Sequence, residues 1–315
     1  MLLINPILSC GKPVERLFID WPLTNWCNFK CSYCPVLRSL SNDFSKPDHT
    51  ANHEITLARL SNLKMPFNMC ITGGEPSLYP YVQDVIQGLA DMEQCQDISF
   101  FSNLVKPVDF YASLSNLGNG KLVVFASYHP QYAHPKFFNK CLEINKLPNI
   151  RFSVHVSMSD NSELWPTTLD FLEFLKTNQI EFKPCILAPT QDYQPDYTDE
   201  FFKTFQSYLE EAENTAGEMG GWTYFEEVDC TFEDGSRRVL KDYEIEYQNL
   251  NRFKGYTCTP ASLTVRIDGT IDITCTGKKL PLYLGGDIIK KETCPNDICP
   301  SRRMTNYYKE RSWTT

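Results

Sequence analysis

Short runs of β-branched and aromatic residues alternate with longer amphipathic stretches over the first two thirds of the chain. Residues 82–89, for example, place valine, isoleucine and leucine at intervals of three and four positions, the spacing of a helix that packs one face against a sheet. The apolar runs are short, as strands are. The predicted strands are 16–23, 67–72, 97–102, 122–127, 151–158 and 181–187, and the further predicted helices are 108–117, 135–146, 164–177 and 198–213.

This alternation predicts a parallel sheet, because a helix between two strands returns the chain to the same edge by a right-handed crossover. We therefore predict an α/β fold, a partial (β/α)6 barrel of the TIM type, over residues 14–215. The carboxyl ends of all six strands open on one rim of such a barrel, where barrel enzymes place their chemistry. The loops at 24–35, 73–76, 102–104 and 127–130 each follow a strand, so we expect them to meet there.

The regular alternation ends near residue 215. Residues 216–255 are rich in Gly, Glu, Asp and Tyr, and we predict a linker or an irregular cover there. A smaller C-terminal unit is predicted over 256–315. It contains a β-hairpin at 262–275, in which Asp268 and Gly269 form a favoured tight turn.

Composition and charge narrow the possible functions. The chain has 315 residues, of which 42% are hydrophobic, so it can bury a substantial core. Its net charge of -9 argues against an extended basic surface, and we expect no nucleic acid partner. We see neither a signal peptide nor an apolar run long enough to cross a bilayer, so we expect a cytoplasmic protein with no membrane partner.

Thirteen cysteines are a high count, and an odd number cannot pair completely within one chain. In a reducing compartment, clustered cysteines hold a metal or a cluster more often than they form disulfides. Six cysteines are scattered and are expected to be ordinary core or surface residues. The other seven fall into a first group, Cys27, Cys31 and Cys34, and a second group, Cys258, Cys275, Cys294 and Cys299.

The first group has the spacing C-x3-C-x2-C and stops at three ligands. A structural zinc site would need a fourth cysteine or histidine, and the next histidine is His49, after Pro47. A 4Fe-4S cluster on three thiolates keeps one iron without a protein ligand, available to a substrate or a cofactor. Zinc remains the alternative.

The stretch CNFKCSYC, followed by GGEP after the next strand, resembles the radical S-adenosylmethionine (SAM) superfamily. The signature of that family is C-x3-C-x2-C with an aromatic residue before the last cysteine, as Tyr33 is here. The resemblance implies a 4Fe-4S cluster on Cys27, Cys31 and Cys34, with the amino and carboxylate groups of SAM on the open iron. It further implies reductive cleavage of SAM to a 5'-deoxyadenosyl radical that abstracts hydrogen from a substrate. An electron donor such as flavodoxin or ferredoxin would supply the electron.

The resemblance also implies a cofactor-binding set. Glycines allow the backbone to approach a ligand closely, and Glu75 can accept a charge-assisted hydrogen bond from the SAM amino group. The sequence SNL at 102–104 resembles the family's polar SAM contact, although relatives often have glycine where Leu104 stands. The alternative is that these segments are ordinary turns after strands. The implied set is Tyr33, Gly73, Gly74, Glu75, Ser102, Asn103 and Ser127.

The second cysteine group resembles the twitch or SPASM auxiliary-cluster extension of radical SAM enzymes. The spacing from Cys258 through Gly269 to Cys275 is C-x10-G-x5-C, one residue longer after the glycine than usual. Four cysteines suit a single auxiliary cluster of the 4Fe-4S type, which would act as an electron relay or would stabilise the fold. If one of these four cysteines were not a ligand, the iron left without a protein ligand could coordinate the substrate. Structural zinc is the alternative.

The substrate is only weakly determined by the sequence. We favour a peptide that is oxidised, epimerised or cross-linked, with a sugar, aminocyclitol or nucleotide as the alternative. Cys185 and Cys230 are candidate hydrogen donors, and His129 is a third catalytic candidate. A different class of function is a zinc-binding protein without enzymatic activity. Candidates for polar substrate contacts are Tyr128, His129, His155 and Lys183.

Overall fold

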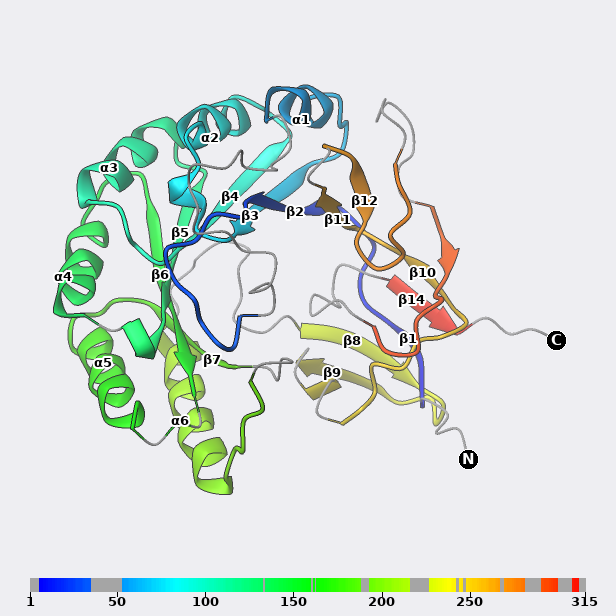
Figure 1. Ribbon diagram of the computed structural model, residues 1–315. Helices are drawn as coiled ribbons and strands as arrows, with labels where there is room; N and C mark the ends of the chain where they lie inside the picture. Colours follow the sequence, from blue (N-terminus) through cyan, green and yellow to red (C-terminus); the bar gives the residue numbers. More distant parts are fainter. Residues whose placement is uncertain are drawn as a thin grey trace.

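The structure, a computed structural model, contains two β-sheets (Figure 1). One sheet has eight strands in the order β12-β11-β2-β3-β4-β5-β6-β7, and the other has six in the order β13-β10-β14-β1-β8-β9. The residues described are 6–34, 53–132, 134–159, 161, 163–187, 193–215, 227–241, 244–245, 248–266, 269–280, 290–299 and 308–311.

Six neighbouring strands of the larger sheet are parallel, as predicted. The sheet curves without closing, so the predicted partial barrel is confirmed. Each strand has the β-branched and aromatic content expected of a buried strand. They are β2 (Leu17–Thr24), β3 (Phe67–Gly73), β4 (Cys95–Ser102), β5 (Leu122–Tyr128), β6 (Arg151–Met158) and β7 (Phe182–Ile186).

Helices cover the outer face of this sheet (Figure 1). In the helix at 82–90, the apolar stripe seen in the sequence is fully buried at Val85, Ile86 and Leu89. Two short 3-10 helices, η2 (Pro76–Leu78) and η3 (Pro130–Tyr132), follow β3 and β5. They lie at the rim where the parallel strands end. The α-helices are α1 (His53–Leu60), α2 (Val82–Ala90), α3 (Val108–Leu117), α4 (Pro135–Ile144), α5 (Trp165–Thr177) and α6 (Asp199–Thr215).

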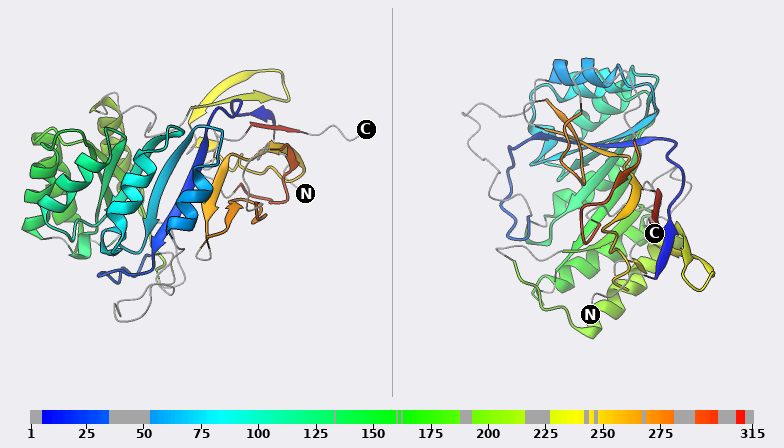
Figure 2. Two further views of the ribbon diagram at one scale, coloured as in Figure 1. Left: turned by 90° about the horizontal axis from the view of Figure 1, so that it is seen from above. Right: turned by 90° about the vertical axis from the view of Figure 1, so that its right-hand side faces the viewer.

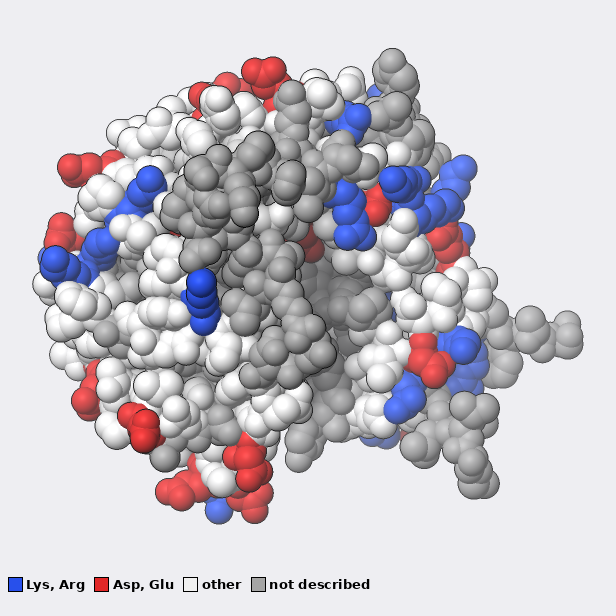
Figure 3. Space-filling view, viewed as in Figure 1, with Lys and Arg blue, Asp and Glu red and all other residues white. Residues whose placement is uncertain are grey.

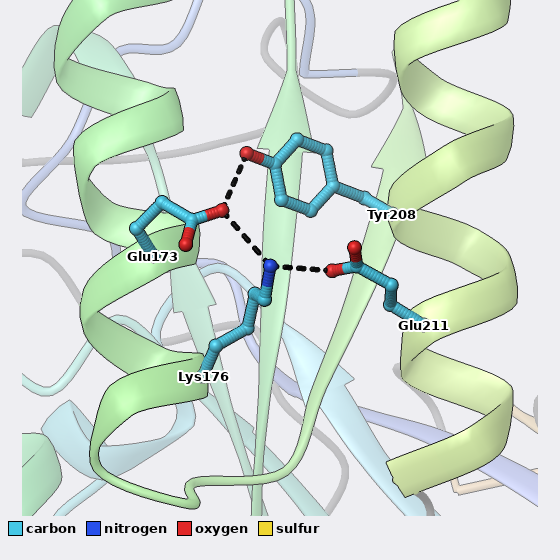
Figure 4. Close-up of polar contacts among 4 residues, drawn as sticks. All are labelled: Glu173, Lys176, Tyr208 and Glu211. Atoms are coloured by element: carbon cyan, nitrogen blue, oxygen red, sulfur yellow. Dashed lines mark hydrogen bonds and ion pairs between the residues drawn. The ribbon is translucent and has the colours of Figure 1, made fainter.

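Surface contacts join the last two helices of the barrel (Figure 4). The ammonium group of Lys176 on α5 lies 3.1 Å from the Glu173 carboxylate and 2.8 Å from that of Glu211 on α6. The Tyr208 hydroxyl also donates to Glu173, at 2.9 Å. Exposed ion pairs contribute little individually, so this network mainly fixes the orientation of α6 beside β7. Figure 3 shows acidic side chains gathered at this lower edge of the molecule.

The predicted hairpin at 262–275 forms and extends the barrel sheet; Asp268 of its predicted turn lies outside the described residues. Strand β11 (Ser262–Val265) pairs in parallel with β2, and β12 (Ile271–Ile273) pairs antiparallel with β11. The hairpin therefore covers an edge of β2 that would otherwise present unpaired backbone groups.

The six-stranded sheet is antiparallel and combines both ends of the chain (Figure 2). The Tyr256 hydroxyl donates to the Ile7 carbonyl at 2.6 Å, which fixes the first strand against the C-terminal segment. The strands are β1 (Ile7–Cys10), β8 (Glu227–Phe232), β9 (Arg237–Lys241), β10 (Tyr256–Thr259), β13 (Glu292–Thr293) and β14 (Tyr308–Arg311).

The segment predicted to be a linker or a cover thus contains a regular hairpin, β8–β9. The hairpin was missed although β8 alternates buried Val228, Cys230 and Phe232 with Asp229 and Thr231, because three of the five residues of its partner β9 are charged. Gly235 makes the turn with φ +78°. The predicted domain limits themselves stay predictions.

None of the described helices is long and apolar enough to cross a membrane.

Candidate functional site

The first cysteine group lies in the loop that follows β2, at the rim where the parallel strands end (Figure 1). The Cys27 and Cys31 side chains are buried and Cys34 is half-buried. Burial raises the pKa of Cys27 to about 11, and the nearby Glu75 carboxylate and the thiols of Cys31 and Cys34 add to this. The three thiols are therefore neighbours, and binding of a metal cluster would have to displace their protons.

The GGEP loop after β3 is hydrogen-bonded directly to the start of the cysteine loop. The Gly74 amide donates to the Thr24 carbonyl at 2.7 Å, and the Glu75 amide donates to the Trp26 carbonyl at 2.6 Å. A Cβ atom at Gly74 would lie 2.2 Å from the Trp26 oxygen, and one at Gly73 would lie 2.4 Å from the Thr24 oxygen. The glycines are thus required by contact between two protein backbones, whatever they also do for a ligand.

Glu75 is buried, with 1% of its surface exposed, and it joins the loops after β3 and β4. Its carboxylate accepts hydrogen bonds from the Ser77 amide at 3.1 Å, the Ser102 hydroxyl at 2.8 Å and the Asn103 amide at 2.6 Å. Burial raises the pKa of Glu75, and these donors oppose that shift. A carboxylate has about four acceptor positions, so one remains for a ligand's ammonium group.

The loop after β4 also reaches the cysteine loop. The Asn103 side-chain amide donates to the Asn28 side-chain oxygen at 3.0 Å. Leu104 has φ +55°, a conformation that favours glycine, and its amide donates to the Ser102 hydroxyl at 3.1 Å. Leu104 therefore has a backbone conformation that is costly for a residue with a side chain.

The end of β5 supports the cysteine loop from the other side. The Tyr33 hydroxyl and His129 Nδ1 are 3.0 Å apart, and the Lys30 amide donates to the Tyr132 hydroxyl at 2.8 Å. The rings of Phe29 and Tyr132 stack, with centroids 4.0 Å apart and planes 7° apart. Burial lowers the pKa of His129 to about 4, so the ring is neutral near pH 7. His129 therefore supports the cysteine loop through Tyr33.

The Gln131 and Tyr33 side chains influence the Cys31 thiol. Burial raises the pKa of Cys31, while hydrogen bonds from Gln131 and Tyr33 oppose that shift. Hydrogen bonds to cluster sulfurs adjust the reduction potential of an iron-sulfur cluster. Asn28, Gln131 and Tyr132 were not predicted as site residues. The only signal in the sequence was their position in loops that follow strands.

Comparison with known proteins gives partial matches. No family model matches the chain. A GTP 3',8-cyclase of Nostoc punctiforme is 36% identical over 83 residues, which are 26% of this chain and 25% of that protein. The GTP 3',8-cyclase of Haemophilus influenzae is 22% identical over 158 residues, 46% of this chain and 44% of that protein. The chain thus spans about a quarter of the length of the first relative and less than half of the second.

Two solved structures have the same fold. SuiB of Streptococcus suis bound to S-adenosylmethionine gives a TM-score of 0.54 at 13% identity, covering 89% of this chain and 63% of SuiB. The structure of anSMEcpe with bound AdoMet gives a TM-score of 0.51 at 15% identity, covering 93% of this chain and 78% of that chain. The relatives and the fold agree with the CNFKCSYC and GGEP motifs. The chain thus resembles radical SAM proteins in its sequence motifs and in its fold.

The second cysteine group is also assembled in the structure. Cys258, Cys294 and Cys299 are buried and Cys275 is half-buried. Burial raises the pKa of Cys258 to about 12; the Lys309 ammonium opposes this, and the thiols of Cys275, Cys294 and Cys299 add to it. The group is held by backbone bonds, including one from the Cys299 amide to the Asn251 carbonyl at 2.8 Å. Within the described ranges, no three Cys, His, Asp or Glu side chains converge closely enough to hold a single metal ion.

The inner face of the partial barrel carries a row of polar side chains. Ser127, His155 and Lys183 are direct neighbours across β5, β6 and β7, and each is partly exposed. Burial lowers the pKa of His155 to about 3, and the Lys183 ammonium contributes to this. Two rings flank the row: Phe101 and Phe125 have centroids 4.9 Å apart, and both contact His155.

Two candidates named from the sequence lie elsewhere. Tyr128 is 1% exposed and stacks on Phe171 of α5 at 4.2 Å, so it faces the helices and cannot contact a substrate in the barrel. Cys230 is on β8, in the six-stranded sheet, whereas Cys185 is partly exposed on the barrel strand β7. Tyr128 faces outward because side chains alternate between the two faces of a strand. Cys230 lies outside the barrel because the chain has entered the second sheet by that point.

Proposed function

We propose that this protein reductively cleaves SAM and uses the resulting radical to abstract hydrogen from a C-H bond of a peptide. The observation that carries the proposal is the convergence of three strand ends on the cysteine loop. The GGEP loop, the SNL loop and the segment after β5 all bond to the loop of Cys27, Cys31 and Cys34. Three thiols so placed leave a fourth coordination position for SAM.

Each residue of the site would have its own role in binding the cluster or SAM. Cys27, Cys31 and Cys34 would hold a 4Fe-4S cluster, which with SAM supplies a 5'-deoxyadenosyl radical. Glu75, with one acceptor position left, would bind the SAM amino group. The cofactor set would also include the backbone of Tyr33, Gly73 and Gly74, together with Ser102, Asn103 and Ser127.

The inner face of the barrel would receive the substrate. Ser127, His155 and Lys183 offer hydrogen-bond donors there, beside the rings of Phe101 and Phe125. Cys185, two residues along β7 from Lys183 and opposite Ser157, would be the hydrogen donor if the reaction is an epimerisation. Oxidation or cross-linking would need no such donor.

Two findings bear on the substrate class. SuiB bound to its precursor peptide SuiA has a TM-score of 0.54 and covers 93% of this chain, which supports a peptide. The sequence relatives are named GTP 3',8-cyclase, which favours a nucleotide as the second candidate. The peptide is preferred because the SuiB match extends over both sheets, whereas the cyclase matches reach less than half of the chain.

The second cysteine group would hold an auxiliary 4Fe-4S cluster. The thiols of Cys275, Cys294 and Cys299 all lie near Cys258, and four thiolates can complete a 4Fe-4S cluster. A flavodoxin or a ferredoxin in the cytoplasm would supply electrons.

The test begins with anaerobic purification and iron analysis, for which two 4Fe-4S clusters predict about eight irons per chain. Dithionite and SAM are then expected to give 5'-deoxyadenosine. Candidate peptides and GTP, each deuterated at carbon, separate the two substrate classes, because deuterium moves into 5'-deoxyadenosine only from a true substrate. A colourless protein with stoichiometric zinc and no 5'-deoxyadenosine would refute the proposal. Transfer from GTP alone would replace the peptide with the nucleotide.

A further inference from the structure

Two cysteines outside both groups face each other across neighbouring strands. Cys10 on β1 and Cys230 on β8 are direct antiparallel partners. The Gly11 amide donates to the Asp229 carbonyl at 3.1 Å, so the adjacent Cys10–Cys230 pair is one without backbone hydrogen bonds between its members. In such pairs the Cα atoms are about 4.5 Å apart and the side chains approach most closely. A disulfide can span that separation without movement of the backbone.

The two cysteines share one small core. Both are free thiols, and each is 2% exposed within the core of the six-stranded sheet. The Cys230 thiol donates to the Val228 carbonyl at 3.5 Å. Interaction between the two cysteine side chains raises the pKa of Cys10 and lowers the pKa of Cys230. Cys230 is thus the more acidic thiol of the pair and the one from which disulfide exchange would start.

The pair also belongs to a row that reaches the second cysteine group. Cys10 is the register partner of Lys309 on β14, and Lys309 is the register partner of Cys258 on β10. Direct cross-strand partners have their side chains on the same face of a sheet. The Lys309 side chain is 1% exposed, and its ammonium lies 5.2 Å from the centre of the Phe253 ring. A single buried cation therefore separates the thiol pair from Cys258.

We propose that Cys10 and Cys230 are a modification site, at which a reversible cross-strand disulfide forms by exchange with a small disulfide such as oxidised glutathione. The Cys230 thiolate attacks one glutathione sulfur, forming a mixed disulfide and releasing one glutathione thiolate. Cys10 gives its proton to that thiolate and attacks the Cys230 sulfur, which releases the second glutathione. Two protein thiols are oxidised, and one disulfide is reduced to two thiols.

Access to the buried pair is possible from one side of the sheet. Strand β9, which pairs with β8, is the last strand in the sheet order, and its Arg237, Arg238 and Val239 are exposed. Opening of this edge hairpin exposes Cys230 without disturbing the barrel. The product covalently joins β1 to β8 and removes the ionisable thiol of Cys10, the register partner of Lys309.

The test uses the full chain, purified anaerobically and equilibrated to constant composition with glutathione buffers of increasing oxidised fraction. Samples are quenched in acid, alkylated with a maleimide, digested and analysed by mass spectrometry. A peptide linking Cys10 to Cys230 is expected to increase with the oxidised fraction and to disappear again on reduction. Cys230→Ser should abolish it and leave Cys10 alkylated. Cys95 and Cys141, buried residues that serve as controls, should be alkylated throughout.

The measurements distinguish a Cys10–Cys230 disulfide from its absence. Complete alkylation of Cys10 and Cys230 at the most oxidising ratio would overturn the proposal, as would linkage of either residue to another cysteine. A second readout is the unfolding temperature, expected to rise on oxidation in the wild type and to be insensitive to the buffer in Cys10→Ser. None of these outcomes depends on SAM cleavage, so the proposal and the proposed function can fail separately.

Discussion

The first cysteine group comes from one short loop, whereas the second is collected from separate segments. Cys258 lies on β10, Cys275 follows β12 of the barrel sheet, and Cys294 and Cys299 follow β13. The first group is supported by strand ends on both sides, including the Asn28–Asn103 bond and the Lys30–Tyr132 bond. The second is supported mainly by backbone bonds near each cysteine.

This difference indicates how each site depends on the fold. The local loop brings its three thiols together by chain connectivity, and tertiary contacts only fix its orientation. The dispersed group exists only after two sheets have formed, so a cluster bound there contributes its binding free energy directly to folding. We expect the first site to govern chemistry and the second to govern stability.

The largest expected effect comes from removing each group in turn. Replacing Cys27, Cys31 and Cys34 with Ala should reduce dithionite-dependent 5'-deoxyadenosine to background, because the open iron is lost. Replacing Cys258, Cys275, Cys294 and Cys299 should lower the unfolding temperature but leave some SAM cleavage. Each variant should keep about four irons. Equal loss of SAM cleavage in both variants would contradict the division of roles.

The next effect comes from crowding the cysteine loop. Gly74→Ala places a Cβ atom 2.2 Å from the Trp26 carbonyl oxygen, so it should lower the free energy of unfolding by about 3 kcal/mol. Gly277→Ala near the second group is the matched control, because its Cβ meets nothing within 4 Å and only φ +64° is unfavourable. That change should cost about 1 kcal/mol. Urea denaturation measures both, and similar losses would mean that the GGEP contact is loose.

Lowering the pH should destabilise the region around the first cysteine group, because His129 becomes protonated. Its pKa of about 4 in the folded protein lies below the ordinary value of about 6.5, so the stabilisation is present above pH 6.5 and is lost as the pH falls towards 4. Between pH 7 and pH 5 the loss should be about 2 kcal/mol. Denaturation of His129→Gln at both values should show a smaller loss. His134→Gln, at an exposed position, is the matched control, and an identical pH dependence in His129→Gln and the wild type would disprove this assignment.

The smallest effect compares single hydrogen bonds in the two regions. Tyr132→Phe removes the acceptor of the Lys30 amide but keeps the ring that stacks on Phe29, and Asn296→Ala removes the donor to the Cys275 carbonyl. Each should lower the free energy of unfolding by about 1 kcal/mol. Only Tyr132→Phe should speed iron loss from the first group, followed by absorbance with a chelator present. Faster loss in Asn296→Ala as well would show that the sites are coupled.

Much of the barrel could be predicted from the sequence because its signals are local. The buried stripe of α2 and the alternating strands repeat every few residues, and every predicted barrel strand is present in the structure. The β8–β9 hairpin was not predictable in the same way, because β9 is mostly charged and exposed and carries little apolar signal. The role of Tyr128 was wrong because one residue of strand register exchanges the inner face for the outer one.

The sequence by itself determined the two cysteine groups, the GGEP motif and the order of strands and helices, since these depend on residue type and short spacings. Only the tertiary structure decided which distant residues support them. The bond between Asn103 and Asn28 joins residues 75 positions apart, and that between Lys30 and Tyr132 joins residues 102 apart. The Cys10–Cys230 pair likewise depends on the pairing of the first strand with β8. Such contacts follow from sheet order and register, which arise from packing of the whole chain.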